Sequence, residues 1–153
     1  MFILENIKTE EEYLKFIETE KKDNDYYKES QIQNMVIQWL DKNNIDFHPS
    51  FNGIKVKSIG QRAFMKRQGM RSGHPDLTIE KKAGGHEVLF LELKTVKNDL
   101  SKEQKAWCKK KINEGYAVSV SKGYYDAIYK IEKYLEGEPI IWRCKNATER
   151  NAN

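Results

Sequence analysis

The spacing of apolar residues predicts a helix followed by a hairpin. From Lys28 to Leu40, apolar side chains recur three and four positions apart, as in a helix with one face on a core. Two runs of strand-forming residues, Leu77 to Ile79 and Val88 to Leu93, flank Gly84-Gly85 and predict an antiparallel hairpin. Between helix and hairpin, Phe47 to Lys57 contains a proline and an Asn-Gly pair, which indicate two short extended pieces joined by a turn.

The second half of the chain predicts a strand between two helices. A helix from Lys102 to Asn113 is expected to begin after Ser101 and to end before Gly115. Tyr116 to Ser121 is typical of a buried strand, and Tyr124 to Leu135 of an amphipathic helix. A helix thus separates this strand from the hairpin, so the two neighbouring strands should pair in parallel. The predicted fold class is α/β, with a mixed β-sheet flanked by helices.

The two ends of the chain carry weaker signals. Thr9 to Lys21 predicts an acidic helix in front of the core, and Ile140 to Trp142 a final edge strand. The N-terminus does not have the pattern of a secretory signal. Cys108 and Cys144 lack a CxxC partner, which argues against a disulfide framework and a zinc site. We therefore expect a cytoplasmic protein.

Composition fits a single soluble domain. The chain has 153 residues, of which 39% are hydrophobic and 33% are charged. A second core would leave each half too small to bury much surface. No apolar run is long enough to cross a bilayer, so no membrane partner is expected.

Charge is distributed unevenly along the chain. Residues 1–46 hold six lysines and eleven acids, whereas residues 47–75 hold six basic side chains and no acid. A segment of one sign can follow a phosphate backbone, although it can also be a solvated loop. Phe64, within this segment, is either a base-stacking side chain or a buried loop anchor, and we favour the anchor. The candidate nucleic-acid contacts are Lys55, Lys57, Arg62, Lys66, Arg67 and Arg71.

The hairpin brings two acids together. If it turns symmetrically about Gly84, Asp76 lies opposite Glu92, with Cβ atoms about 4.5–5.5 Å apart. Carboxylates at that separation repel one another unless a cation lies between them, which favours Mg²⁺ or Mn²⁺. Strand alternation places Lys94 on the same face as Glu92. The alternative is an exposed hairpin with an ordinary Glu-Lys pair, since a shift of one residue would separate the acids. The histidines lack a ligand spacing and are not expected to bind metal.

Three ordered motifs carry a family resemblance. They are Gly73-His74-Pro75-Asp76-Leu77, then Glu92-Leu93-Lys94, with fifteen residues between Asp76 and Glu92, then Leu100-Ser101-Lys102-Glu103-Gln104. With them, the chain resembles the VRR-NUC family of the PD-(D/E)XK nucleases from about Tyr27 to Leu135. The resemblance implies a restriction-endonuclease-like core. The expected domain division is an N-terminal helical extension at residues 1–26, for which the family offers no counterpart, a nuclease domain at 27–145 and a C-terminal tail at 146–153.

The resemblance also implies roles for individual residues. Asp76, Glu92 and the carbonyl of Leu93 would bind the metal, and Lys94 would be the catalytic lysine. Glu29 would reach the metal or one of its waters, but it could equally be an acid in the first turn of a helix. Gln104 matches a glutamine of the family's active site, although Ser101 and Gln104 also form a capping-box pattern.

The implied activity is hydrolysis of phosphodiester bonds. Small stand-alone members resemble viral or phage enzymes that act as homodimers on branched DNA such as Holliday junctions, here in the host cytoplasm. Alternatives are a flap or nicking nuclease on the same core, and a nucleic-acid-binding module without turnover. A sequence-specific restriction enzyme ranks lowest, because base readout would normally need more chain.

Overall fold

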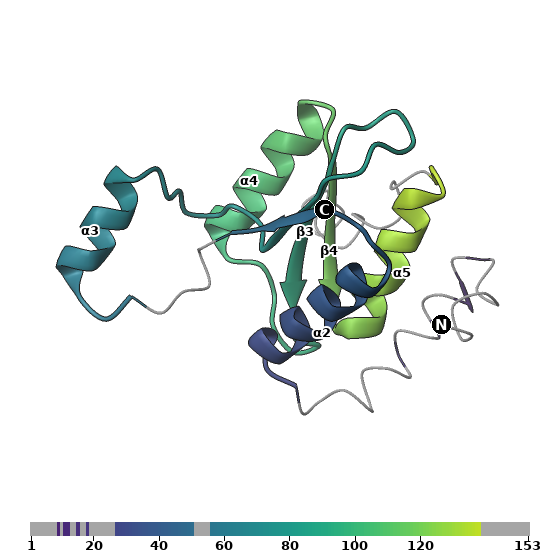
Figure 1. Cartoon of the computed structure of the whole chain (residues 1–153), viewed down its shortest axis with the longest axis horizontal. Helices are drawn as coiled ribbons and strands as arrows, with labels where there is room; N and C mark the ends of the chain where they lie inside the picture. The colour runs from purple at the N-terminus through teal and green to yellow at the C-terminus, as the bar shows by residue number, and fades with distance from the viewer. Residues whose placement is uncertain are drawn as a thin grey trace, which may run out of the picture.

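In the computed structural model of this chain, described residues are 27–50 and 56–138, together with 9, 11, 12, 15 and 18. The predicted helix at Thr9 to Lys21 lies largely outside them, and the Asn52-Gly53 turn and the strand at Ile140 to Trp142 lie wholly outside. The elements are α2 (Glu29–Lys42), β1 (Phe47–Pro49), α3 (Ile59–Arg67), β2 (Leu77–Ile79), β3 (Leu89–Lys94), α4 (Lys102–Asn113), β4 (Ala117–Lys122) and α5 (Tyr124–Leu135) (Figure 1).

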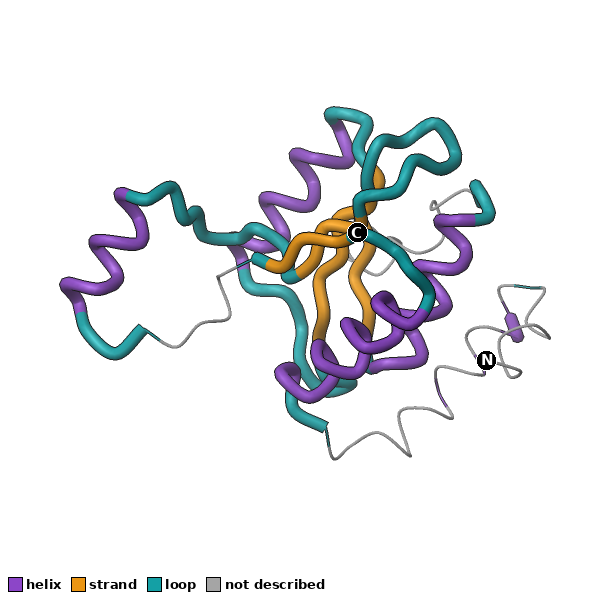
Figure 2. Tube along the Cα trace, in the orientation of Figure 1, coloured by secondary structure: helices purple, strands orange, loops and turns teal. Residues whose placement is uncertain are grey.

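Four strands form one mixed sheet in the order β1-β2-β3-β4 (Figure 2). The first two pairings are antiparallel, and β3 and β4 are parallel, as predicted from the helix that joins them. Within the hairpin, Leu77 pairs with Leu91 and Ile79 with Leu89. This register is the symmetric one about Gly84 and is confirmed. The α/β fold class with helices flanking a mixed sheet is therefore correct.

The two faces of the sheet are covered by different helices. Leu89, Leu91 and Leu93 are buried in one core with side chains of α2 and α5. On the other face, the ring of Phe90 meets Trp107 of α4 edge to face, with centroids 5.0 Å apart. The alternation along β3 thus sends its leucines to the main core and leaves Glu92 and Lys94 for the α4 side.

Helices α4 and α5 begin and end where the sequence predicts. The Ser101 hydroxyl accepts the Gln104 N–H at 3.2 Å, which satisfies a free donor at the start of α4. Gly115 and Gly137, both at positive φ, follow the two helices and close them. Local chemistry therefore decides these boundaries. Of the helices within the described residues, none has the length and apolar character needed to traverse a membrane.

Helix α3 is an element that the hydrophobic pattern does not predict. Its N-terminus is capped by Ser58, whose hydroxyl accepts the Gln61 N–H at 3.1 Å, but none of its residues is buried. The helix stands apart from the sheet, at the left of Figure 1. The favoured interpretation of Phe64 as a buried anchor is wrong, because its side chain is 53% exposed. Without an apolar stripe, only the cap and the sequence's helical propensity mark this segment.

Candidate active site

A pocket of about 400 Å³ opens where the start of β2 meets the end of β3. The antiparallel pairing of β2 with β3 places the residue that directly precedes β2 beside the last residues of β3. Side chains that are distant in the sequence therefore meet there. The N-termini of α2 and α4 contribute the remaining walls. The lining residues are Glu29, Ser72, Gly73, His74, Asp76, Glu92, Lys94, Ser101, Glu103 and Gln104.

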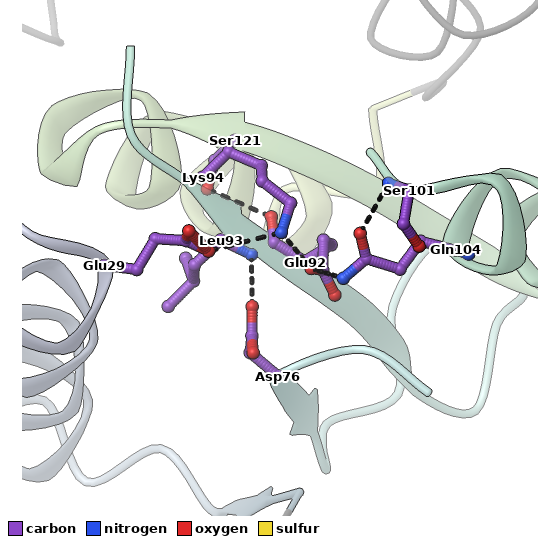
Figure 3. A network of polar contacts seen from close by, with 8 residues as sticks. All are labelled: Glu29, Asp76, Glu92, Leu93, Lys94, Ser101, Gln104 and Ser121. Carbon is purple, nitrogen blue, oxygen red and sulfur yellow. Dashed lines mark hydrogen bonds and ion pairs between the residues drawn. The ribbon is translucent and has the colours of Figure 1, made fainter. Parts of the chain in front are cut away.

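Asp76 is held against the backbone of β3. Its Oδ2 accepts the Leu93 N–H at 2.8 Å (Figure 3). The loop before Asp76 lies on the first turn of α4 at Gly73, where φ is +83°. A Cβ at that position would lie 2.9 Å from the Glu103 carbonyl oxygen. Only glycine therefore allows the loop to approach α4 and aim Asp76 at the end of β3.

Lys94 joins two carboxylates at the centre of the pocket. Its Nζ lies 2.9 Å from Oε1 of Glu92 and donates a hydrogen bond of 3.2 Å to Oε1 of Glu29. Glu29 reaches it from the first turn of α2, and Glu92 is two residues away on the same face of β3 (Figure 3). A carboxylate from the start of α2 and one from the end of β3 thus both contact the ammonium group of Lys94.

Gln104 performs two tasks that the sequence presented as alternatives. Its Oε1 accepts the Ser101 N–H at 2.8 Å, which completes the capping box of α4. Its Nε2 donates to Oε1 of Glu92, the oxygen that also faces Lys94 (Figure 3). Capping therefore orients the amide so that its donor points at the buried carboxylate.

Burial makes both acids resist ionisation, and the charge of Asp76 adds to this effect at Glu92. The Glu92 residue is 1% exposed. Burial, and next the charge of Asp76, raise the pKa of Glu92 to about 7, although Lys94 opposes the shift. Burial also raises the pKa of Asp76, against the hydrogen bond from Leu93. The pocket therefore holds more potential negative charge than its single lysine balances.

Lys94 remains protonated in this setting. Burial by itself would lower the pKa of its ammonium group, but the hydrogen bond and charge of Glu92, with the charge of Glu29, raise that pKa above its usual value. An ammonium group has donors and no acceptor. Lys94 is consequently suited to stabilising negative charge and not to accepting a proton.

The donor set fits a hard cation with few protein ligands. A dication between Asp76 and Glu92 would relieve the repulsion by which Asp76 raises the pKa of Glu92. Among the described residues, no three His, Cys, Asp or Glu side chains are grouped as a metal site. Two carboxylates with a backbone carbonyl and waters match Mg²⁺, which usually keeps several waters. Glu29 is paired with Lys94 in this structure. A contact of Glu29 with the metal or one of its waters therefore stays a prediction.

All five residues predicted to be catalytic border this pocket: Glu29, Asp76, Glu92, Lys94 and Gln104. The basic side chains predicted to contact nucleic acid lie elsewhere. Lys57, Arg62, Lys66, Arg67 and Arg71 are on or beside α3, and Lys55 lies outside the described residues.

The sequence reasoning overlooked His74. Its Nδ1 lies 3.1 Å from the Pro75 carbonyl oxygen, and its ring centroid is 5.2 Å from that of Trp107. The side chain thereby forms a wall of the pocket between the loop and α4. Its position two residues before Asp76 in the first motif was the available signal.

Comparison with known proteins agrees with this architecture. A search of curated proteins finds no match. A solved structure described as a VRR_NUC domain protein is similar, with 27% sequence identity and a TM-score of 0.60 over 72% of this chain and 91% of that one. The family model for the VRR-NUC domain matches residues 18–124. With that match over most of its length and a nuclease-type fold, the chain belongs to the VRR-NUC family.

Proposed function

We propose that the protein is a structure-specific DNA endonuclease of the PD-(D/E)XK type, dependent on Mg²⁺ or Mn²⁺. The observation that carries the proposal is the meeting of Asp76 and Glu92 with Lys94 in one pocket. Two acids of raised pKa beside a protonated lysine make a perturbed site in a cleft, a frequent mark of catalysis. VRR-NUC membership supports nuclease chemistry in general.

Asp76, Glu92 and the carbonyl of Leu93 are the proposed holders of the metal. When bound there, a divalent ion polarises a phosphoryl oxygen and makes its water more acidic. Gln104 keeps the Glu92 carboxylate oriented through its hydrogen bond, and Gly73 keeps Asp76 in position. These supports hold the ligands before substrate arrives, so little reorganisation is needed during the reaction.

Lys94 is the proposed electrostatic catalyst. Its protonated Nζ faces the pocket between Glu92 and Glu29 and can donate to a phosphate oxygen. Charge that develops on the phosphoryl group during hydrolysis is stabilised by such a preorganised donor. Glu29 then acts by holding the ammonium in place.

We propose branched DNA, such as a Holliday junction, as the substrate. The basic residues of α3 and its flanks would contact the phosphate backbone and fix its register. Resolution of a junction requires two symmetric cuts, which a twofold homodimer supplies. Gel filtration with light scattering should give twice the monomer mass; a monomer that still resolves junctions would contradict the dimer.

A cleavage panel tests the activity. A four-way junction, a flap, a nicked duplex and a linear duplex are incubated with Mg²⁺ or Mn²⁺, and with chelator. We expect metal-dependent cutting of the junction, reduced at least about 100-fold in Asp76→Ala and Lys94→Ala. Asp41→Ala is the matched control, because Asp41 is exposed at the opposite end of α2 from Glu29.

The panel also separates the competing functions. Unchanged cutting by either active-site variant would remove the assignment of these residues. Binding without a metal-dependent product would favour a nucleic-acid-binding module. Preference for the flap or the nicked duplex would move the substrate away from junctions while keeping the same chemistry.

A further inference from the structure

A second pocket lies beside the active site and has a different character. It has a volume of about 450 Å³, in the range of small-ligand sites, and lies between β1 and α3 with the loop after α3. His74 lines both pockets, so one side chain separates them. Whatever enters the second pocket is therefore a close neighbour of a group in the first.

The walls of this pocket are mainly apolar and aromatic. Pro49 contributes from β1, Phe64 and Met65 from α3, and Met70 from the loop. Phe64 remains 53% exposed, on a helix with no buried residue. A half-exposed aromatic ring in a hollow offers a flat apolar surface for stacking.

Arg71 sets the charge at this pocket. Its Nη1 donates to the carbonyl oxygens of Lys66 and Met70, each at 3.1 Å, which anchors the guanidinium at the end of α3. A guanidinium has five donors, so further donors remain for an anion. Arg71 thus offers both an ionic contact and a planar surface.

Charge complementarity indicates the ligand. Residues 47–75, which supply most of the pocket, contain six basic side chains and no acid. Helical geometry places Arg62 and Lys66 on the side of α3 opposite Phe64, with Met65 on the face between Arg62 and Phe64. The segment therefore combines an apolar hollow with a cationic ridge, which suits a ligand with a flat apolar part and a phosphate.

We infer that this pocket receives an unpaired base of the DNA substrate, next to the phosphate held in the active site. The inference rests on the proposed nuclease function. A base inside a duplex has both faces stacked on neighbours and must be unstacked and unpaired, at a cost in free energy, before it can enter a side pocket. A base that is already unpaired, as in a flap, or that lies at the branch point of a junction, where its stack is interrupted, enters at lower cost and can stack on Phe64 while its backbone continues past His74 into the active site. The pocket thus gives branched DNA an advantage over continuous duplex.

A double-mutant-type cycle tests the stacking contact by combining a substitution in the protein with removal of the base from the DNA. The affinity for flap DNA is measured in chelator, so that nothing is cut, and compared with that for the same DNA whose unpaired nucleotides are abasic. Base removal should weaken binding to the unmodified protein about 10-fold. Phe64→Ala should weaken binding to intact flap DNA about 10-fold, with no further loss on the abasic DNA. Phe64→Trp should restore the dependence on the base.

The matched control is Ile59→Ser. Ile59 is a 90% exposed apolar residue of the same helix and does not line the pocket. This variant should keep the full dependence on the base. Because Phe64 and Ile59 both lie on a helix without buried residues, the fold should survive each change, which circular dichroism checks.

The outcomes distinguish the inference from the proposed function. An equal loss on base removal in the unmodified protein and in Phe64→Ala would overturn the base pocket, as would an equal effect of Ile59→Ser. Metal-dependent cleavage without base dependence contradicts the pocket alone. Base-dependent binding without cleavage contradicts the nuclease alone, and no binding to either DNA contradicts both.

Discussion

Two buried lysine–carboxylate pairs in this protein serve different purposes. Lys94 and Glu92 meet at 2.9 Å in the active-site pocket. Lys130 and Asp126 meet at 3.1 Å, four residues apart on α5. The side chains of all four residues are less than a tenth exposed. Residue types, distances and burial alone therefore do not distinguish the pair that we propose to be catalytic from the structural one.

The difference lies in what surrounds each pair. Asp126 also accepts the Lys122 N–H at 2.7 Å, and Lys130 also donates to the Val120 carbonyl, so the pair ties α5 to β4. One acid and one base balance each other there. At Lys94, by contrast, Asp76 and Glu29 add further negative charge, and the group lines an open pocket. Excess charge with access to solvent marks the pair that can bind a cation.

The strongest effect is expected on stability, at the pair of Lys130 and Asp126, which we call the closed pair. Lys130→Met should leave Asp126 buried without its ammonium partner and lower the free energy of unfolding by about 3–5 kcal/mol. Lys94→Met should cost less, because Glu92, with a pKa of about 7, can take up a proton instead. Urea denaturation of the two variants at neutral pH measures the difference. Equal losses in the free energy of unfolding of the two variants would show that the two pairs contribute to stability in the same way.

The next effect is on activity, at the pair of Lys94 and Glu92, which lines the open pocket and which we call the open pair. Lys94→Met should lower the cleavage rate about 10²–10³-fold, because a donor to developing charge is lost. Lys130→Met should keep most of its rate per folded molecule, since Lys130 does not line the pocket. Single-turnover rates, corrected for the folded fraction, test this contrast. A large rate loss in folded Lys130→Met would mean that the closed pair also supports catalysis.

A third effect is the pH dependence of the metal-free protein. The folded state holds a proton on Glu92 more tightly than the unfolded state, because the pKa rises from an ordinary 4.5 to about 7. The stabilisation from this group is thus complete below about pH 4.5 and is lost as pH rises through 7, by about 3 kcal/mol at most. Glu92→Gln should lack this contribution to the pH dependence.

Denaturation of the protein and of Glu92→Gln, in chelator between about pH 4.5 and 8, isolates this contribution. Other titrating groups contribute to both curves, so the difference between them reports Glu92. Parallel curves would contradict the raised pKa. Addition of Mg²⁺ near pH 8 should recover stability in the unmodified protein and not in the variant, if the ion binds there.

The weakest effect is a loss of stability at Gly73, in the loop that positions Asp76 in the active-site pocket. Gly73→Ala should destabilise the protein by about 1–3 kcal/mol, because the new Cβ meets the Glu103 carbonyl and φ is positive. Gly60→Ala is the matched control, since it lies in α3 with nothing within 4 Å and should gain about 0.5–1 kcal/mol of local helix stability. Thermal unfolding measures the first change, and circular dichroism the second. A harmless Gly73→Ala would mean that the loop can bring Asp76 to β3 without this close approach.

Local patterns predicted most of the core. The spans of α4 and α5 and the hairpin register follow from caps, turn residues and periodicity, which act over a few neighbouring positions. The symmetric register is also sufficient to predict that Asp76 lies near Glu92. Helix α3 escaped prediction because it has no apolar stripe, and Phe64 was placed wrongly because burial depends on what the rest of the chain covers.

The order of residues is enough to specify which strands form, how the hairpin pairs and which acids can meet. It took the folded molecule to show that Gln104 caps α4 and also holds Glu92, and that Glu29 shares Lys94 with Glu92. Folding also places the second pocket beside the first, with His74 between them. The two kinds of feature differ in range: caps and strand alternation are set by neighbours in the chain, whereas burial, charge balance and pocket shape arise from groups that are far apart until the chain folds.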